Sequence, residues 1–301
     1  DGVTALVFNF IDQLTHGRTE NSTLFEVARD TPALRNLTRT WFERWIDAPW
    51  LSSFDVIWSA SKRAVASLSE RTTTPVEFMP IATNDRRFSA AQPHEAYRSD
   101  YCFTGSFFRS RRDIIDCLDP DALPYTFALF GHNWGEMAWL APFWRNAVPY
   151  HEMPRVYAST KIVVDDANHT VKPWGSVNSR VFDAIAAGRL VVTNGAVGND
   201  EVLDGILPTY SSAAELSAVL SRYLQDEEAR GKLVSKVREL VLSRHTYCHR
   251  AREAHASLRR LLTGARLSVR DLPPTSRSST AARLVVDQLR ARGCWARLRS
   301  G

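Results

Sequence analysis

Apolar residues in this chain form short continuous runs, separated by segments in which they recur at helical spacing. The runs predict buried strands at 54–59, 75–79, 101–104, 127–130, 161–164 and 190–192. The intervening segments predict helices at 61–70, 113–117 and 149–157. Because strand and helix alternate, we expect a parallel sheet with ligands at the carboxyl ends of its strands. The loops that gather there would follow Thr104, Phe130, Val164 and Thr193.

One stretch, residues 174–194, organises this interpretation. Its small polar residues Ser176, Asn178 and Ser179 can cap a helix, whose apolar positions then recur from 181 to 186. Gly188 is a typical residue for the end of that helix. The sequence therefore predicts loop, helix, glycine turn and strand, with a helix N-terminus free to receive an anion.

Other segments are less regular. Residues 5–11 resemble a strand and 32–45 a helix, whereas the polar stretch 80–93 indicates a domain boundary. We expect a glycine-rich loop at 195–203 and two or three amphipathic helices between 212 and 262.

Length and composition fit a soluble globular protein, or a fragment of one, with room for two domains. The chain has 301 residues, of which 44% are hydrophobic and 24% charged, and no run of about 18 apolar residues occurs. Its first residues, Asp1 and Gly2, begin neither a signal peptide nor a typical native start. The four cysteines form no CxxC pair, which argues against a zinc site or a disulfide framework and fits a cytoplasmic protein. They are Cys102, Cys117, Cys248 and Cys294.

The net charge of +5 is concentrated at the C-terminus. Residues 261–301 carry eight arginines against two aspartates, so the other 260 residues have a net charge of −1. This distribution, together with the linker-like run 273–280, predicts a flexible solvated tail, with a polyanion-binding arm as the alternative. We expect no nucleic-acid partner.

Two groups of residues could bind a phosphate or a metal. Gly105 and Ser106 follow a predicted strand and precede Arg109, Arg111 and Arg112, so open backbone N–H groups and guanidinium groups could hold a phosphate there. A solvated basic turn is the alternative. Near the N-terminus, Asp12 and His16 are four residues apart and could meet one divalent ion.

Five segments, in this order, resemble the GT-B glycosyltransferases, in particular the spore-maturation-type branch with a group 1-like donor domain. The resemblance spans about 50–262 and rests on 103–112, 129–134, 148–162, 178–188 and 244–247. It implies an α/β fold in which the Rossmann-like donor domain, 94–262, is complete. Residues 50–93 would be a truncated acceptor domain with its linker, and 263–301 the tail.

The resemblance also implies a bacterial-type transferase that moves a sugar from a nucleotide-sugar to an unidentified glycan, lipid or protein acceptor, without a metal or other cofactor. The diphosphate would lie on the helix start at 176–179 beside Arg180 and the basic turn after Gly105. Asp183 replaces the glutamate with which the family holds the ribose hydroxyls; alternatively it is an exposed acid paired with Arg180. The resemblance identifies no catalytic base.

Several other residues are candidates for ligand contact. Trp134 and Trp174 could stack on a base or sugar, or pack in the wall of the site. Asp200 and Glu201 stand where the family often contacts the donor. The candidate histidines are His132, His151 and His169.

Residues 3–44 resemble a piece of the PglZ domain of the alkaline-phosphatase superfamily, which places a fragment of that type at 1–49. Asp12 and His16 would match that superfamily's metal ligands, although the further ligands and the nucleophile of such an enzyme are missing upstream. Two alternatives to sugar transfer therefore stay open: a nucleotide-sugar-binding remnant without turnover, and a metal-dependent phosphoesterase.

Overall fold

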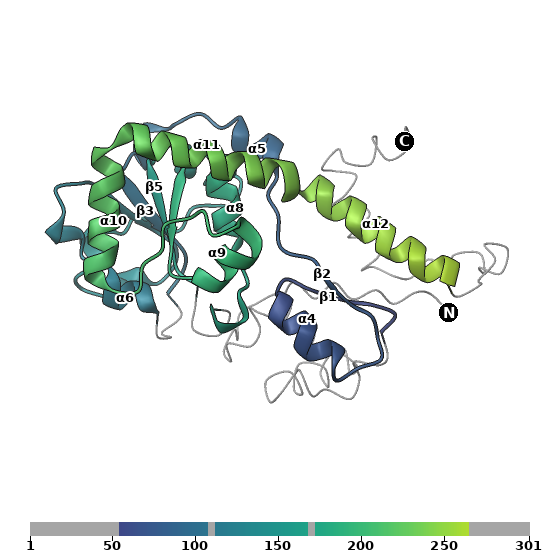
Figure 1. Cartoon of the computed structure of the whole chain (residues 1–301). Helices are drawn as coiled ribbons and strands as arrows, with labels where there is room; N and C mark the ends of the chain where they lie inside the picture. Colours follow the sequence, from purple (N-terminus) through teal and green to yellow (C-terminus); the bar gives the residue numbers. More distant parts are fainter. Residues whose placement is uncertain (1–53, 108–111, 168–171, 265–301) are drawn as a thin grey trace. The chain divides into compact units, whose positions relative to one another are not determined.

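A computed structural model describes residues 54–107, 112–167 and 172–264 (Figure 1). Residues 54–245 belong to one compact unit and residues 246–264 to a second. The second unit contributes α12 (Tyr247–Gly264). No helix in the described ranges is long and apolar enough to cross a membrane.

A four-stranded parallel sheet forms the centre of the first unit. Its strands lie in the order β4 (Phe127–Phe130), β3 (Tyr101–Thr104), β5 (Ile162–Asp165) and β6 (Leu190–Thr193). Cys102 pairs with Ala128 on one side and with Val163 on the other. Every residue of these strands is buried, as expected for a parallel sheet covered on both faces. The α/β class predicted from the sequence is thus confirmed.

Alternate strand residues supply two separate cores, and Figure 1 shows helices around the strands. Cys102, Val163 and Val191 pack with helix residues such as Phe182 on one face. Tyr101, Ile162 and Leu190 pack on the other face. The first core involves α5 (Asp85–Ser89), α7 (Met153–Ala158), α8 (Ser179–Ala186), α9 (Ala196–Leu203) and α11 (Glu227–Arg244); the second involves α6 (Asp113–Cys117) and α10 (Ala213–Gln225).

A smaller parallel pair precedes this sheet. β1 (Ile57–Ser59) and β2 (Val76–Phe78) are joined by α4 (Lys62–Ser69), and Trp58 pairs with Glu77. Short 3-10 helices form five further turns: η4 (Glu95–Tyr97), η5 (Pro120–Ala122), η6 (Trp134–Glu136), η7 (Ala141–Phe143) and η8 (Lys172–Trp174).

Both edge strands of the larger sheet make one additional bridge. Leu129 of β4 pairs with Trp144, and Thr193 of β6 pairs with Thr209. The backbone N–H of Arg145 donates to the Leu129 carbonyl (2.8 Å). Segments outside the sheet therefore cover part of each outer edge.

Most predicted elements occur where the sequence places them, with one clear exception. The strands at 101–104 and 127–130, the helix at 113–117 and the helices after 212 are confirmed. The loop expected at 195–203 is wrong, because α9 occupies it. Gly198 sits inside this helix since a Cβ there would lie 2.8 Å from the Gly175 carbonyl oxygen. The glycine therefore reflects close packing of two backbones and not a loop.

Two further groups of predictions concern the domain boundary and the two ends of the chain. The stretch 80–93, interpreted as a domain boundary, contains α5, which packs against α8. The division into domains stays a prediction. The predictions for residues 3–45, including the pair Asp12 and His16, and for the tail beyond 264 lie outside the described residues.

Candidate functional site

Two adjacent aspartates organise the carboxyl edge of the sheet. Asp165 accepts hydrogen bonds from Asn178 (2.8 Å), Arg180 (3.1 Å) and Thr193 (2.8 Å). Asp166 accepts from Arg112 Nε (2.7 Å) and Asn194 Nδ2 (2.9 Å). Both carboxylates are buried, so each needs the ion pair that it makes.

The two arginines in these pairs lie over the same aromatic ring. The Cζ atoms of Arg112 and Arg180 are 5.2 Å and 4.8 Å from the centroid of Phe103. Arg112 also donates through Nη1 to the Ser106 carbonyl (2.9 Å). Carboxylate and ring together fix both guanidinium groups in place.

The loops after β3 and β4 meet backbone to backbone at this edge. Gly131 has φ +142°, and a Cβ there would lie 2.1 Å from the Gly105 carbonyl oxygen. A Cβ at Gly105 would in turn lie 2.9 Å from Arg180 Nη2. The Trp134 indole N–H donates to the same Gly105 carbonyl (2.6 Å). Gly131 is therefore required where the two loops pack together, whereas Gly105 leaves room for the guanidinium group of Arg180.

Helix α8 begins at this edge without a side-chain cap. Asn178 occupies the N-cap position, but its amide donates to Asp165 and to the Asp166 carbonyl. Ser179, the first helical residue, is exposed. An uncapped, accessible first turn can bind an anion.

The space behind this helix start is too small for a phosphate. A void of about 10 Å³ borders Ser176, Val177 and the start of α9, and this volume holds at most one water molecule. Ser176 is itself buried. An anion at α8 would therefore lie on the outer side of the first turn, beside Ser179.

Lys172 is a partly exposed cation in the segment that precedes this helix start. Its Nζ donates to Asp113 Oδ2 (2.7 Å), and its side chain is 35% exposed. In the described part of this edge, three cations, Arg112, Arg180 and Lys172, balance three carboxylates. Arg109 and Arg111 lie outside the described residues.

Asp183 lies in the second turn of α8 and is only 3% exposed. Its Oδ1 accepts a hydrogen bond from the Thr83 hydroxyl (2.6 Å), and its Oδ2 accepts one from the Tyr150 hydroxyl (3.4 Å). Burial and the negative charge of Asp183 raise the pKa of the nearby Tyr157 above its usual value. The alternative of an exposed acid paired with Arg180 is wrong, because Arg180 pairs with Asp165.

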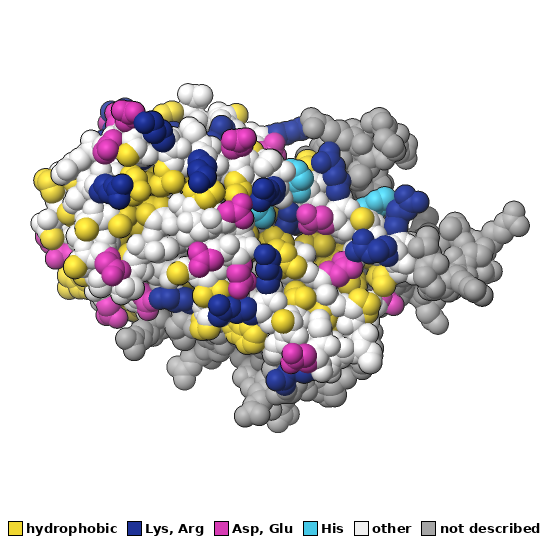
Figure 2. All heavy atoms as spheres, viewed as in Figure 1, with side chains coloured by type: hydrophobic (Ala, Val, Ile, Leu, Met, Phe, Trp, Pro, Cys, Tyr) yellow, Lys and Arg dark blue, Asp and Glu magenta, His cyan; other side chains and the backbone are white. Residues whose placement is uncertain are grey.

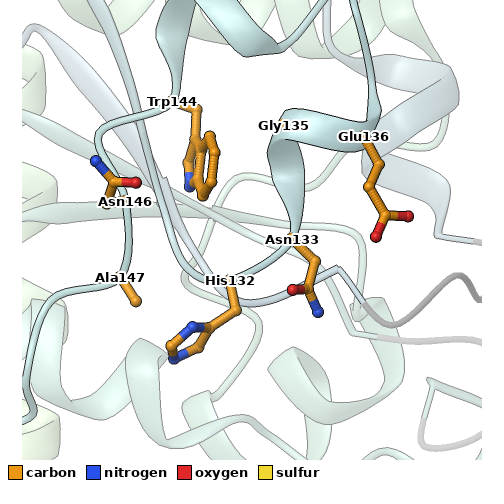
Figure 3. A pocket seen from close by; sticks show the side chains of 7 residues that line it. All are labelled: His132, Asn133, Gly135, Glu136, Trp144, Asn146 and Ala147. Carbon is orange, nitrogen blue, oxygen red and sulfur yellow. The ribbon is translucent and has the colours of Figure 1, made fainter.

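A surface cavity of about 600 Å³ opens at the carboxyl end of β4 (Figure 3). One wall carries His132, Asn133 and Glu136, and the other carries Trp144 and Asn146; Gly135 and Ala147 complete the lining. These amide, imidazole and carboxylate groups can hydrogen-bond hydroxyl groups or a base. The candidate histidine His132 therefore faces a cavity.

The other candidates lie in varied surroundings. Trp134 is buried and stacks on Phe107 (5.4 Å), so it packs in the wall of the site. The Trp174 carbonyl accepts from Ser61 (2.5 Å) and Glu201 accepts from Arg63 (3.2 Å), whereas Asp200 is exposed. His151 is exposed beside Glu152, and His169 lies outside the described residues.

Sequence reasoning missed three residues of this arrangement: Thr83, Tyr150 and Asn194. The polar residue directly after a parallel strand could have indicated Asn194. Thr83 and Tyr150 lie in connecting segments far from Asp183 in sequence, so no local pattern indicates them. Within the described ranges, no group of three or more His, Cys, Asp or Glu residues could hold a metal ion.

The surface shown in Figure 2 carries positive and negative side chains interspersed.

Part of the chain is similar to a known protein family. Residues 109–256 match the model of a family described as glycosyl transferase-like. No curated protein sequence matches the chain.

Solved structures resemble the chain in fold. Sucrose-phosphate synthase from Thermosynechococcus elongatus is 15% identical, with a TM-score of 0.55 over 79% of this chain and 66% of its own length. WaaG, a glycosyltransferase involved in lipopolysaccharide biosynthesis, is also 15% identical, with a TM-score of 0.52 over 78% of this chain and 72% of its own. An α,α-trehalose-phosphate synthase (UDP-forming) from Burkholderia vietnamiensis is 8% identical, with a TM-score of 0.53 over 77% of this chain and 65% of its own.

The chain thus spans about two thirds of the length of these structures. At such low identities the likeness concerns the fold. Residues 109–256 of this chain are thus similar to the glycosyl transferase-like family, and the α/β fold of the chain is similar to that of the GT-B glycosyltransferases.

Proposed function

We propose that this protein transfers a sugar from a nucleotide-sugar donor to a hydroxyl group of an acceptor. One observation carries the proposal: α8 presents an uncapped first turn and, further along the same helix, a carboxylate. Asp183 lies five residues beyond the N-cap Asn178, or roughly 7 Å along the helix axis. A single nucleotide can bridge this separation, with its diphosphate at the helix start and its ribose at Asp183.

The diphosphate would lie beside Ser179 on the outer side of α8. Backbone N–H groups and the helix dipole favour an anion there. Lys172, which precedes this helix start in the sequence and is partly exposed, supplies positive charge. Because Arg112 and Arg180 are already balanced by aspartates, we propose that Arg109 and Arg111 supply the remaining charge, as the basic turn in the sequence suggests.

The ribose would bind at Asp183. A carboxylate accepts hydrogen bonds from two neighbouring hydroxyl groups, and Asp183 Oδ1 is already fixed by Thr83. The segment 146–150 leads from the cavity at β4 to Tyr150, whose hydroxyl contacts Asp183 Oδ2. The base would lie along this segment.

The reaction needs no protein nucleophile. The acceptor oxygen forms a bond to the anomeric carbon, the bond to the diphosphate oxygen breaks, and the nucleoside diphosphate leaves with the electron pair. The helix start and the basic side chains stabilise the charge that develops on the leaving group. A base takes the proton of the acceptor hydroxyl, and the described residues identify no such base.

Calorimetric titration of the full chain with UDP-, GDP- and TDP-sugars, with and without divalent ions, tests the donor site. We expect one of them to bind and Asp183→Asn to weaken it by at least 10-fold. Asp204→Asn is the matched control, since it neutralises an aspartate exposed beside Arg244. Equal binding by wild type and Asp183→Asn would refute the ribose role.

Turnover separates catalysis from binding alone. Incubation of the bound nucleotide-sugar with candidate glycan, lipid and protein acceptors should release the nucleoside diphosphate. Binding without release would favour a non-catalytic sugar-nucleotide-binding protein. A thermal shift with zinc or manganese alone that depends on His16 would instead favour the metal-dependent phosphoesterase.

A further inference from the structure

Tyr150 is an unusual side chain for its position. Among the described residues, only Tyr150 and Trp139 are large apolar side chains that are exposed, and Tyr150 is 50% exposed. It nevertheless contacts Asp183, which is one of the three buried carboxylates among the residues that the structure describes. An exposed aromatic ring beside a buried carboxylate offers both a stacking surface and a hydrogen-bonding group to one ligand.

Two residues of α5 hold the ring of Tyr150 in place. The buried Phe88 contacts it edge to face, with centroids 6.2 Å apart and planes at 64°. The Arg87 guanidinium lies over the ring, 5.6 Å from its centroid. Both residues belong to α5, which packs against α8. The ring therefore stays near Asp183 without depending on the hydrogen bond between them.

The two hydrogen bonds that Asp183 accepts from Thr83 and Tyr150 differ in length, and their donors differ in exposure to solvent. Thr83 is fully buried and donates over 2.6 Å, a short bond to a carboxylate. Tyr150 donates over 3.4 Å, near the outer limit for a hydrogen bond, and from an exposed position. A ligand hydroxyl arriving from outside can replace the weak bond from Tyr150 while Thr83 keeps the carboxylate oriented.

We propose that Tyr150 is the base-binding residue of the donor site. When the nucleotide binds, a ribose hydroxyl replaces the Tyr150 hydroxyl as the donor to Asp183 Oδ2. The ring of Tyr150 then stacks on the base of the same nucleotide. Stacking is tolerant of base identity because every base has a π-face. Tyr150 therefore contributes affinity for any nucleobase and does not select one base over another. This role rests on the proposed function.

The test compares two ligands that differ only in the base. Full-length wild type, Tyr150→Phe and Tyr150→Ala are titrated with the nucleoside diphosphate that wild type binds best, and with ribose 5-diphosphate. Tyr150→Ala should weaken the nucleoside diphosphate by about 10-fold or more and leave ribose 5-diphosphate within about 2-fold. Tyr150→Phe keeps the ring and removes the competing hydroxyl, so it should bind the nucleoside diphosphate at least as tightly as wild type.

Controls and contrary outcomes separate this inference from the proposed function. Trp139→Ala removes the other large apolar side chain that is exposed in the described ranges and should change neither affinity. Equal loss for both ligands in Tyr150→Ala would show that the ring acts only through the fold and would overturn the stacking role, as would no loss for either. If wild type binds no nucleotide at all, the donor site itself is refuted.

Discussion

The hydroxyl of Thr83 donates a 2.6 Å hydrogen bond to the carboxylate of Asp183, one hundred residues later in the sequence. Both side chains are buried. The Thr83 backbone N–H also donates to the carbonyl of His245, directly after α11 (3.0 Å). Thr83 therefore connects the segment after β2 to α8 and to the end of α11, two helices that pack on the larger sheet. It also orients Asp183, the acid proposed to hold the donor ribose.

Replacement of Thr83 by valine removes the hydroxyl and keeps the shape of the side chain. The buried carboxylate then loses a short hydrogen bond, so the free energy of unfolding should fall by about 1–3 kcal/mol. Nucleotide affinity should fall several-fold, because Asp183 is no longer held in one orientation. Urea unfolding and calorimetric titration measure the two effects. Thr83→Ser should retain both properties, and a valine variant equal to wild type would contradict this role.

The pair of Arg112 and Asp166 should behave as a buried ion pair. Arg112→Met leaves an unpaired buried carboxylate, and we expect a loss of about 3–5 kcal/mol in unfolding free energy. The double variant Arg112→Met with Asp166→Asn should lose less than the sum of the single variants. Arg244→Met, which breaks an exposed pair, should cost under about 1 kcal/mol. Additive losses in the double variant would show that the two residues do not depend on each other.

Two glycine-to-alanine substitutions should change the free energy of unfolding in opposite directions. Gly131→Ala places a Cβ 2.1 Å from the Gly105 carbonyl oxygen and forces an unfavourable φ, so it should destabilise the protein by about 2 kcal/mol or more. Gly231 lies inside α11, and a Cβ added there would meet no atom within 4 Å. Gly231→Ala should therefore stabilise the protein by about 0.5–1 kcal/mol. Thermal unfolding of both variants checks the contrast.

Alkaline pH should destabilise the fold through buried ionisable groups. Burial raises the pKa of the Cys102 thiol to about 12, whereas an unfolded thiol titrates near about 8.5. Below both values each state keeps its proton. Between them only the unfolded state loses it, so stability falls as pH rises, by about 2 kcal/mol at pH 10 from this group. Urea unfolding between pH 8 and 10.5 gives the free energy of unfolding as a function of pH. This free energy should fall less steeply with pH in Cys102→Ala than in wild type, and an equal pH dependence would contradict the assignment.

The sequence could predict the sheet because its signals are local. Continuous apolar runs such as 101–104 and 127–130 are typical of strands buried on both faces. The helix start at Asn178 is also predictable, since small polar residues precede a periodic apolar segment. The loop predicted at 195–203 is wrong because Gly198 has a tertiary reason: it lets α9 approach Gly175.

The site is less predictable because its partners are distant in sequence. The sequence shows that Arg112 belongs to a basic turn, but its pairing with Asp166 follows from strand order, which local patterns do not specify. The family resemblance indicates Asp183, yet the burial of Asp183 under Thr83 and Tyr150 depends on how separate connecting segments fold onto α8. Contacts of this kind appear only once the tertiary fold is known.

The single bridges along β4 and β6 have a consequence for association between copies of the chain. An unprotected outer strand offers a row of N–H and C=O groups to any passing extended peptide. Trp144 and Thr209 already occupy part of those rows. A foreign strand would first have to displace them, so the sheet is protected against growth into aggregates at both margins.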